Sequence, residues 1–130
     1  MTAEVLVQLR EVGKNFPVKS GSVFAPRKAR LQAVAGVSLD LRRGETLGLV
    51  GETGCGKSTL ARCVVRLLDL SAGQVLFDGH DISAASHREL EPYRRRMQMV
   101  FQDPYGSLNP RRRVGSIIGD PFAIHGIGDA

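Results

Sequence analysis

The stretch GETGCGKST, residues 51–59, follows a short apolar run, TLGLV, at 46–50. Three of its residues are glycines, which let a backbone bend tightly and bring several N–H groups close to one anion. After Lys57 the apolar residues Leu60, Val64 and Leu67 recur at helical spacing, so the stretch is expected to join a buried strand to a helix. The amino end of a helix adds unpaired N–H groups and a positive dipole. The stretch therefore predicts a phosphate-binding loop.

The spacing from Gly51 to Ser58 matches the pattern Gly-x-x-x-x-Gly-Lys-Ser. In this pattern Lys57 supplies a cation for the β- and γ-phosphates, Ser58 offers a hydroxyl to Mg²⁺, and Thr59 is a further donor on the α-phosphate side. The remaining loop positions are Glu52, Thr53, Gly54, Cys55 and Gly56. The alternative is a glycine-rich turn that binds nothing, with Cys55 only a small tolerated residue. The apolar run before the loop and the amphipathic helix after it favour nucleotide binding.

Composition places the chain among soluble single domains. It has 130 residues, of which 42% are hydrophobic and 24% charged. No apolar stretch reaches the roughly 20 residues that span a bilayer, and the start MTAEVLVQLR does not have the form of a secretory signal. The two cysteines, Cys55 and Cys63, imply no disulfide framework and favour a reducing compartment.

The formal net charge of +5 comes largely from two arginine runs, at 94–96 and 111–113. Such runs can mark contact with nucleic acid or anionic lipid. No aromatic residues interleave with the arginines to stack on bases, so we interpret the runs as solvated surface and expect no nucleic-acid partner. A DNA-associated ATPase is the alternative, and it would show salt-sensitive DNA binding.

Apolar patterns predict an α/β order of elements along the chain. Strands are expected at 5–12, from 33 to 42, and at 46–50, 74–77 and 97–101, with 46–50 and 97–101 apolar on both faces and therefore buried. Helices are expected from Lys57 to about Asp69, across 87–96 with a possible restart at Pro92, and from 114 to a break near Pro121. Residues 16–32 are expected to form a loop or loose hairpin, 78–79 a tight turn and 102–111 a loop.

Two longer strings carry a family resemblance. LGLVGETGCGKSTLARCVVRLL and MVFQDPYGSLNPR together resemble the ATP-binding subunits of ABC transporters, and within them the oligopeptide/dipeptide importer group. The resemblance extends from about Val5 to the last residue. It implies an α/β fold of the P-loop NTPase class, with an antiparallel β-subdomain followed by the start of a RecA-like core. It also implies ATP and Mg²⁺ as cofactors and ATP hydrolysis coupled to peptide uptake, with nickel or sugar importers sharing similar sequences.

The resemblance also assigns residues outside the phosphate loop. Gln102 matches the family's glutamine-loop residue, which is expected to contact Mg²⁺ or the attacking water and to face the membrane subunits. Phe16 falls where the family has an aromatic residue that stacks on adenine. The alternatives are an ordinary polar strand end for Gln102 and a core position in the first hairpin for Phe16.

Several parts of the family pattern cannot be placed in residues 1–130. The Leu-Ser-Gly-Gly-Gln signature, the apolar strand ending in Asp followed by the catalytic Glu, and the switch His are missing, so no catalytic set is complete. We therefore expect a partial ATP-binding domain, the amino-terminal portion of a longer subunit at the cytoplasmic face of the plasma membrane. The expected partners are transmembrane permease subunits, a second ATP-binding subunit and, indirectly, a solute-binding protein. A non-catalytic nucleotide-binding remnant is the competing function.

Overall fold

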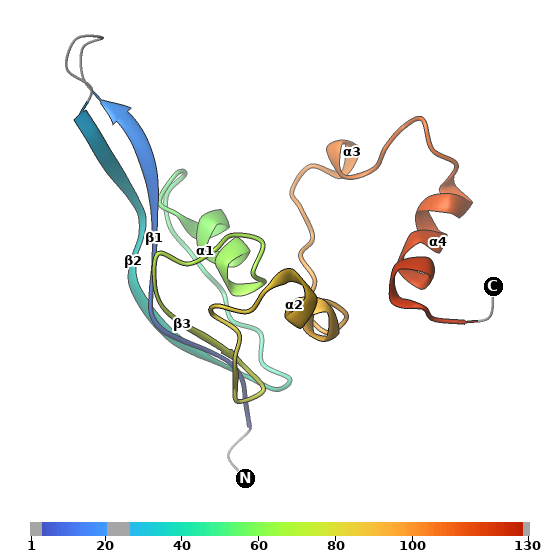
Figure 1. Ribbon diagram of the computed structural model, residues 1–130, viewed down its shortest axis with the longest axis horizontal. Helices are drawn as coiled ribbons and strands as arrows, with labels where there is room; N and C mark the ends of the chain where they lie inside the picture. Colours follow the sequence, from blue (N-terminus) through green and yellow to red (C-terminus); the bar gives the residue numbers. More distant parts are fainter. Residues whose placement is uncertain (1–3, 21–26, 129–130) are drawn as a thin grey trace.

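A four-stranded sheet organises the amino-terminal half of the protein in our computed structural model, which describes residues 4–20 and 27–128 (Figure 1). The strand order is β2-β1-β3-β4, and all three pairings are antiparallel. The strands are β1 (Val5–Ser20), β2 (Arg27–Arg42), β3 (Ala72–Phe77) and β4 (His80–Asp81). The helices are α1 (Lys57–Val64), α2 (His87–Arg94), α3 (Pro104–Ser107) and α4 (Val114–His125).

The β1–β2 hairpin is longer than its sequence predicts. Paired residues continue from Val5↔Arg42 to Ser20↔Arg27, so the loop or loose hairpin expected at 16–32 is a regular hairpin in its described part, and residues 21–26 lie outside the described residues. A register shift between Leu9 and Val12 places Glu11 at a positive φ of 48°. This bulge moves the inward-facing series from odd to even positions, so that Val7, Leu9 and Val12 are all buried.

The predicted tight turn at 78–79 is confirmed. Asp78 and Gly79 have φ values of 54° and 76°, the left-handed conformation that a two-residue hairpin of the right twist requires. The turn joins β3 to the short β4, and Phe77 pairs with His80 across it. It lies beside the ends of the long hairpin, since the N–H of Asp78 donates to the Leu6 carbonyl.

One small core joins the sheet to α1 and α2. Its strand members are Val7, Leu9, Val12, Val34, Val75 and Phe77, and its remaining members are Leu60, Cys63, Ile82 and Leu90. Cys63 is fully buried in this core, and burial raises the pKa of its thiol. This core fixes α1, and with it the loop that precedes α1, against the sheet.

The helix boundaries differ from the sequence prediction at three places. α1 ends at Val64 instead of near Asp69, because Arg66 adopts a positive φ of 54° that breaks the helix. α2 runs without interruption through Pro92, and a capping box between Ser86 and Glu89 fixes its start. α4 continues through Pro121 to His125, so the predicted break is wrong; proline removes one backbone bond there without ending the helix. The expected loop at 102–111 contains the short α3.

The two strands predicted at 46–50 and 97–101 are not formed. Both segments are irregular, and neither belongs to the sheet of the described residues. Most of their side chains are exposed instead of buried, with Val50 95% and Val100 94% accessible, while Met97 and Met99 are half-buried. An apolar pattern states which surface a segment can bury, but a strand forms only when its N–H and C=O groups find a neighbouring strand. Within the described residues, nothing pairs with these two segments.

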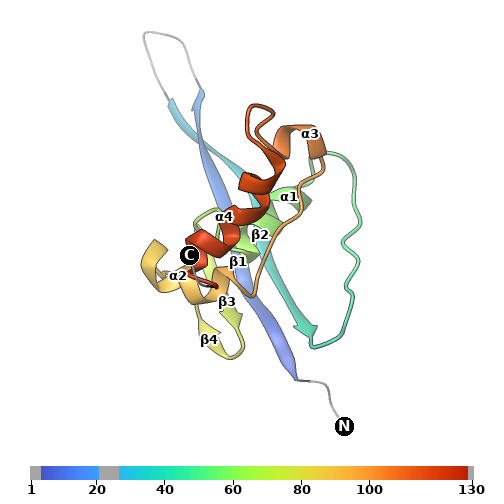
Figure 2. The ribbon, with the colours of Figure 1, turned by 90° about the vertical axis from the view of Figure 1, so that its right-hand side faces the viewer.

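The carboxyl-terminal part extends away from the sheet. In Figure 1, α3 and α4 lie to the right of the sheet and of α1, connected through the segment that follows α2; Figure 2 gives the view at right angles. α4 contains no buried residue. None of the described helices has the length and apolar character needed to cross a membrane.

Candidate nucleotide-binding site

The predicted phosphate loop connects the segment after β2 to α1. Gly54 and Gly56 both adopt left-handed backbone conformations, with φ of 82° and 100°. A Cβ on Gly56 would lie 2.2 Å from the carbonyl oxygen of Ala33 in β2, and one on Gly51 would lie 2.7 Å from Cys55 Sγ. Gly56 is thus required by close approach as well as by dihedral angle, Gly54 by its dihedral angle, and a side chain at Gly51 would displace Cys55. Because Gly56 is also the first residue before α1, its contact with Ala33 fixes the end of the loop against β2.

α1 begins at this loop without a side-chain cap. Gly56 is its N-cap residue and makes no side-chain hydrogen bond, while its carbonyl accepts the first helical bond from Leu60 N at 2.8 Å. The first N–H groups of any helix lack intrahelical partners. With no acidic residue in its first turn, α1 presents these donors and its dipole to whatever lies in the loop.

Lys57 folds back over the loop that precedes it. Its Nζ donates to the carbonyl oxygens of Gly51 and Glu52, both at 2.6 Å, and lies 3.5 Å from Cys55 Sγ. The ammonium group is therefore held above the concave side of the loop. The hydroxyl-bearing residues that follow, Ser58 and Thr59, are exposed and half-buried respectively. A phosphate in the loop would meet one cation, two hydroxyls and the helix donors.

A cavity of about 420 Å³ opens between the phosphate loop and β2. Cys55, Gly56 and Lys57 line it from the loop side, and Gln32 to Ala35 line it from β2. The sequence reasoning missed these β2 residues. The sequence indicated a place near the site for these residues only through the expected hairpin, in which they lie opposite the segment that carries Phe16.

Phe16 lies on β1 and is not among the residues that line this cavity. It pairs with Leu31, the neighbour of the cavity-lining Gln32, and its side chain is half-buried. Phe16 is therefore partly accessible instead of enclosed in the core, and it does not belong to the buried cluster. The Lys14 ammonium lies 5.3 Å from the centre of its ring.

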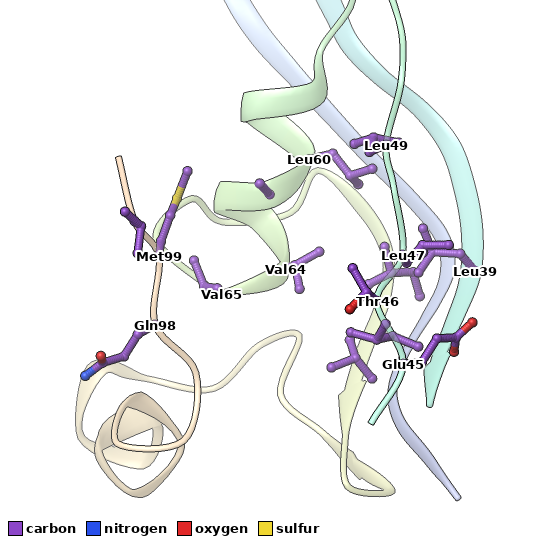
Figure 3. A pocket seen from close by; sticks show the side chains of 15 residues that line it. Leu39, Glu45, Thr46, Leu47, Leu49, Leu60, Val64, Val65, Gln98 and Met99 are labelled. Carbon is purple, nitrogen blue, oxygen red and sulfur yellow. The ribbon is translucent and has the colours of Figure 1, made fainter. Parts of the chain in front are cut away.

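Gln102 is not joined to the loop by any contact among the described residues. Its side chain is exposed, in the irregular segment between α2 and α3. The residues just before it approach α1 from the side away from the sheet: Gln98, Met99 and Val100 share a groove with Ala61, Val64 and Val65 (Figure 3). The structure thus brings the phosphate-loop residues together, while neither Phe16 nor Gln102 lines the cavity beside the loop.

The loop fits a polyphosphate with a divalent cation. At Gly56 the β2 backbone approaches so closely that no side chain fits, and at Gly51 a side chain would meet Cys55 Sγ. The donors that face the concave side of the loop suit an anion, and Ser58 is the nearest hydroxyl for Mg²⁺. Among the described residues no group of three or more His, Cys, Asp or Glu could hold a metal ion.

Comparison with protein families identifies the origin of this arrangement. The family model described as ABC transporter matches residues 34–120, which contain the phosphate loop, α1 and Gln102. The chain belongs to the ABC transporter family. This ABC chain has the family's α/β fold, with the antiparallel sheet and the helices expected of its amino-terminal part.

Curated relatives of the ABC chain carry names of peptide importers. It is 50% identical over 123 residues to the oligopeptide transport ATP-binding protein AppF of Bacillus subtilis, covering 94% of the chain and 37% of that protein. It is 48% identical over 119 residues to a probable peptide ABC transporter ATP-binding protein, y4tS, of Sinorhizobium fredii, covering 92% and 33%. A glutathione import ATP-binding protein, GsiA, of Salmonella paratyphi A is 45% identical over 125 residues, with coverage of 96% and 20%. The chain spans about a third of the first two relatives' length.

Solved structures support the fold of the ABC chain. The ATP-binding cassette MJ0796, in a dimeric post-hydrolysis state with ADP and Pi, superimposes with a TM-score of 0.74 at 24% identity. The match covers 95% of this chain and 50% of that one. At this identity the likeness concerns the fold alone.

Proposed function

We propose that these residues form the nucleotide-binding part of an ATPase subunit that drives uptake of di- or oligopeptides through an ABC importer. The observation that carries the proposal is the phosphate loop itself: two close-packed glycines, an uncapped helix start and the ammonium of Lys57 meet around one concave backbone. The names of the relatives support peptides as the transported solute.

Within this site each residue would have a separate task. The Lys57 ammonium group donates to the carbonyl oxygens of Gly51 and Glu52, and on nucleotide binding it would donate to the γ-phosphate instead. Ser58 would hold Mg²⁺, which when bound neutralises charge between the β- and γ-phosphates. Thr59 and the α1 donors would hold the α-phosphate side. Phe16 would stack on the base, an interaction worth about 1–3 kcal/mol.

Gln102 is proposed to position Mg²⁺ or the attacking water and to face the membrane subunits. Because Gln102 makes no contact with the loop here, this role requires the segment 97–103 to approach the phosphates. Such a movement would link the presence of the γ-phosphate to a surface that a permease could contact. A ligand shifts such an equilibrium only by binding one state more tightly than the other.

We further propose that residues 1–130 are the amino-terminal part of a longer subunit that pairs with a second ATP-binding subunit. This subunit would act with permease subunits at the cytoplasmic face of the membrane, and a solute-binding protein would deliver the peptide. The greater length of the relatives supports this proposal. Reading the coding sequence beyond Ala130 tests it: an in-frame signature motif and Asp-Glu pair are expected.

Substitution of Lys57 tests nucleotide binding directly. Lys57→Ala in the intact protein is expected to abolish ATP binding, since no other ammonium group lies over the loop among the described residues. Isothermal titration with ATP and Mg²⁺ measures the change. Arg62→Ala removes one exposed positive charge from the same helix and should leave the dissociation constant unchanged. An unchanged constant in Lys57→Ala would overturn the loop assignment.

The competing function is a nucleotide-binding remnant without chemistry, and an importer of another solute such as nickel is a second alternative. A remnant would bind ATP with the same dependence on Lys57 but would show no Mg²⁺-dependent turnover in the intact protein. Uptake of labelled peptides or of nickel by membranes with the matching permease separates the two solutes.

A further inference from the structure

We propose that Lys14 is a positioning residue for the nucleotide base: it fixes the Phe16 ring and ties it to the segment that follows the phosphate-binding helix α1. This inference rests on the proposed function, in which Phe16 stacks on the base. The family resemblance gives Lys14 no role. The observation behind it is that one ammonium group joins two parts of the site that are far apart in sequence.

The Lys14 ammonium has two partners. It lies 5.3 Å from the centre of the Phe16 ring, within the range of a cation–π contact. It also donates to the backbone carbonyl oxygen of Asp69 at 2.6 Å. The carbonyl holds the cation in place, so the cation in turn restrains the ring. Lys14 thereby lies over the Phe16 ring, and under the proposal a planar base would stack on the opposite face.

The segment that accepts this bond is itself rigidly attached to α1. Arg66, only 6% exposed, donates to the carbonyls of Leu68 and Ile82, both at 3.0 Å, and pairs with the Asp69 carboxylate at 3.2 Å. These contacts fix the turn that follows α1. The position of the Asp69 carbonyl is therefore coupled to the helix whose other end carries Lys57.

Further bonds join β1 to the same segment on either side of Lys14. Ser71 N donates to the Gly13 carbonyl at 2.8 Å, and Asn15 N donates to Ser71 Oγ at 2.9 Å. Together with the Lys14 bond, they hold the strand that carries Phe16 at a fixed offset from α1. The distance between a base on Phe16 and phosphates at Lys57 is then set by this connection and by the length of α1.

The proposal separates ligands that have a base from ligands that lack one. In the intact protein, Lys14→Met should weaken ATP binding about two- to fivefold, the factor that corresponds to one cation–π contact at an exposed site. Binding of inorganic triphosphate with Mg²⁺, which engages only the phosphate loop, should not change. Lys14→Arg keeps a cation over the ring and should restore ATP affinity. Arg30→Met, which removes an exposed charge from the same hairpin, is the matched control and should change neither ligand.

A double-mutant cycle with Phe16→Ala completes the test. If Lys14 acts through the ring, Lys14→Met should have no further effect on ATP affinity once Phe16 is alanine. Additive losses, or equal losses of ATP and triphosphate, would overturn the proposal because Lys14 would then act on the phosphates or on the fold. Failure of the proposed function has a different signature: neither ATP nor triphosphate would bind to the unsubstituted protein, or Lys57→Ala would bind both normally. If Phe16→Ala alone left ATP affinity unchanged, the Lys14 role would fall while the phosphate loop stood.

Discussion

At the scale of single residues, the phosphate loop has one reactive side chain whose surroundings report on ligand binding. Cys55 is exposed, lines the cavity next to β2 and has its Sγ 3.5 Å from Lys57 Nζ. The second cysteine, Cys63, is fully buried in the core. The two thiols therefore differ in accessibility within one molecule.

This difference makes Cys55 a probe of the loop. A maleimide should label Cys55 in the intact protein, and ATP with Mg²⁺ should slow the reaction at least severalfold, because phosphates over Lys57 cover the neighbouring sulfur. Mass spectrometry of the labelled peptides gives the rate at each thiol, and Cys63 should react only on unfolding. Equal rates with and without ATP would mean that Cys55 faces away from the bound phosphates. Lys57→Ala is the control in which ATP should give no protection.

At the scale of elements, the start of α1 can approach β2 closely because the residue at their contact, Gly56, has no side chain. Gly56 combines a φ of 100° with a position where a Cβ would lie 2.2 Å from the Ala33 carbonyl oxygen. Gly54 has a similar φ of 82° but open space around its missing Cβ. Substitutions at Gly54 and Gly56 therefore distinguish the cost of backbone strain, which both share, from the cost of steric overlap, which only Gly56 has.

Alanine at the two positions should therefore have unequal effects on folding. Gly54→Ala in the intact protein should reduce the free energy of unfolding by about 1–2 kcal/mol, the cost of a left-handed non-glycine residue. Gly56→Ala adds overlap with the β2 backbone and should reduce it by about 2–5 kcal/mol. Urea unfolding of both variants measures the difference. Equal losses would mean that β2 gives way to the added methyl group.

A second contact between elements depends on pH. Asp78, in the β3–β4 turn, accepts from Arg96 at 2.7 Å and from Arg43 at 2.5 Å. Its carboxylate thereby connects the end of β2 to the segment after α2, and Arg96 also lies 4.7 Å from the centre of the Phe77 ring. Hydrogen bonds from Arg96 and then from Arg43 lower the pKa of Asp78 below its ordinary value.

The sign of the pH effect follows from that lowered pKa. The contribution of Asp78 to stability is fully present above the pKa that it has in the unfolded chain, about 3.9, and is lost as pH falls through the lower pKa of the folded state. Asp78→Asn should therefore lower the melting temperature at pH 7 and reduce its fall between about pH 5 and pH 2. Asp40→Asn, which removes an exposed carboxylate bonded to Gln8, is the control and should keep the pH dependence of the parent. If the melting temperature of Asp78→Asn fell with pH as steeply as that of the parent, Asp78 would not be the source of this pH dependence.

Elements whose determinants are local could be predicted from the sequence. The turn at Asp78 and Gly79 follows from two adjacent residues, and the phosphate loop from a fixed spacing. The bulge at Glu11 could not be predicted, because the residue that its carbonyl oxygen approaches, Gly73, belongs to β3, which is far along the chain. The strands expected at 46–50 and 97–101 failed for the same physical reason: an apolar pattern does not specify the neighbour that completes a ladder.

At the scale of the whole molecule, two apolar surfaces lie uncovered. The first is an open groove of about 550 Å³ between the segment at 45–49, α1 and the segment at 98–100, lined almost wholly by aliphatic side chains (Figure 3). The second is the face of α4 that carries Val114, Ile118 and Phe122, all exposed. Exposed apolar patches of this kind promote association.

The 130-residue chain on its own is therefore expected to fold loosely and to hydrolyse no ATP. Its apolar segments would meet one another between molecules, so size-exclusion chromatography should show aggregates and a hydrophobic dye should bind. Hydrolysis needs a group that positions or activates water, and Gln102, the residue proposed for this task, is exposed and out of contact with the loop. Turnover with Mg²⁺ and ATP should thus equal that of the Lys57→Ala control. A soluble monomer with a cooperative melt and Mg²⁺-dependent turnover above that control would show that the groove and the α4 face need no cover, and that residues 1–130 contain the whole catalytic apparatus.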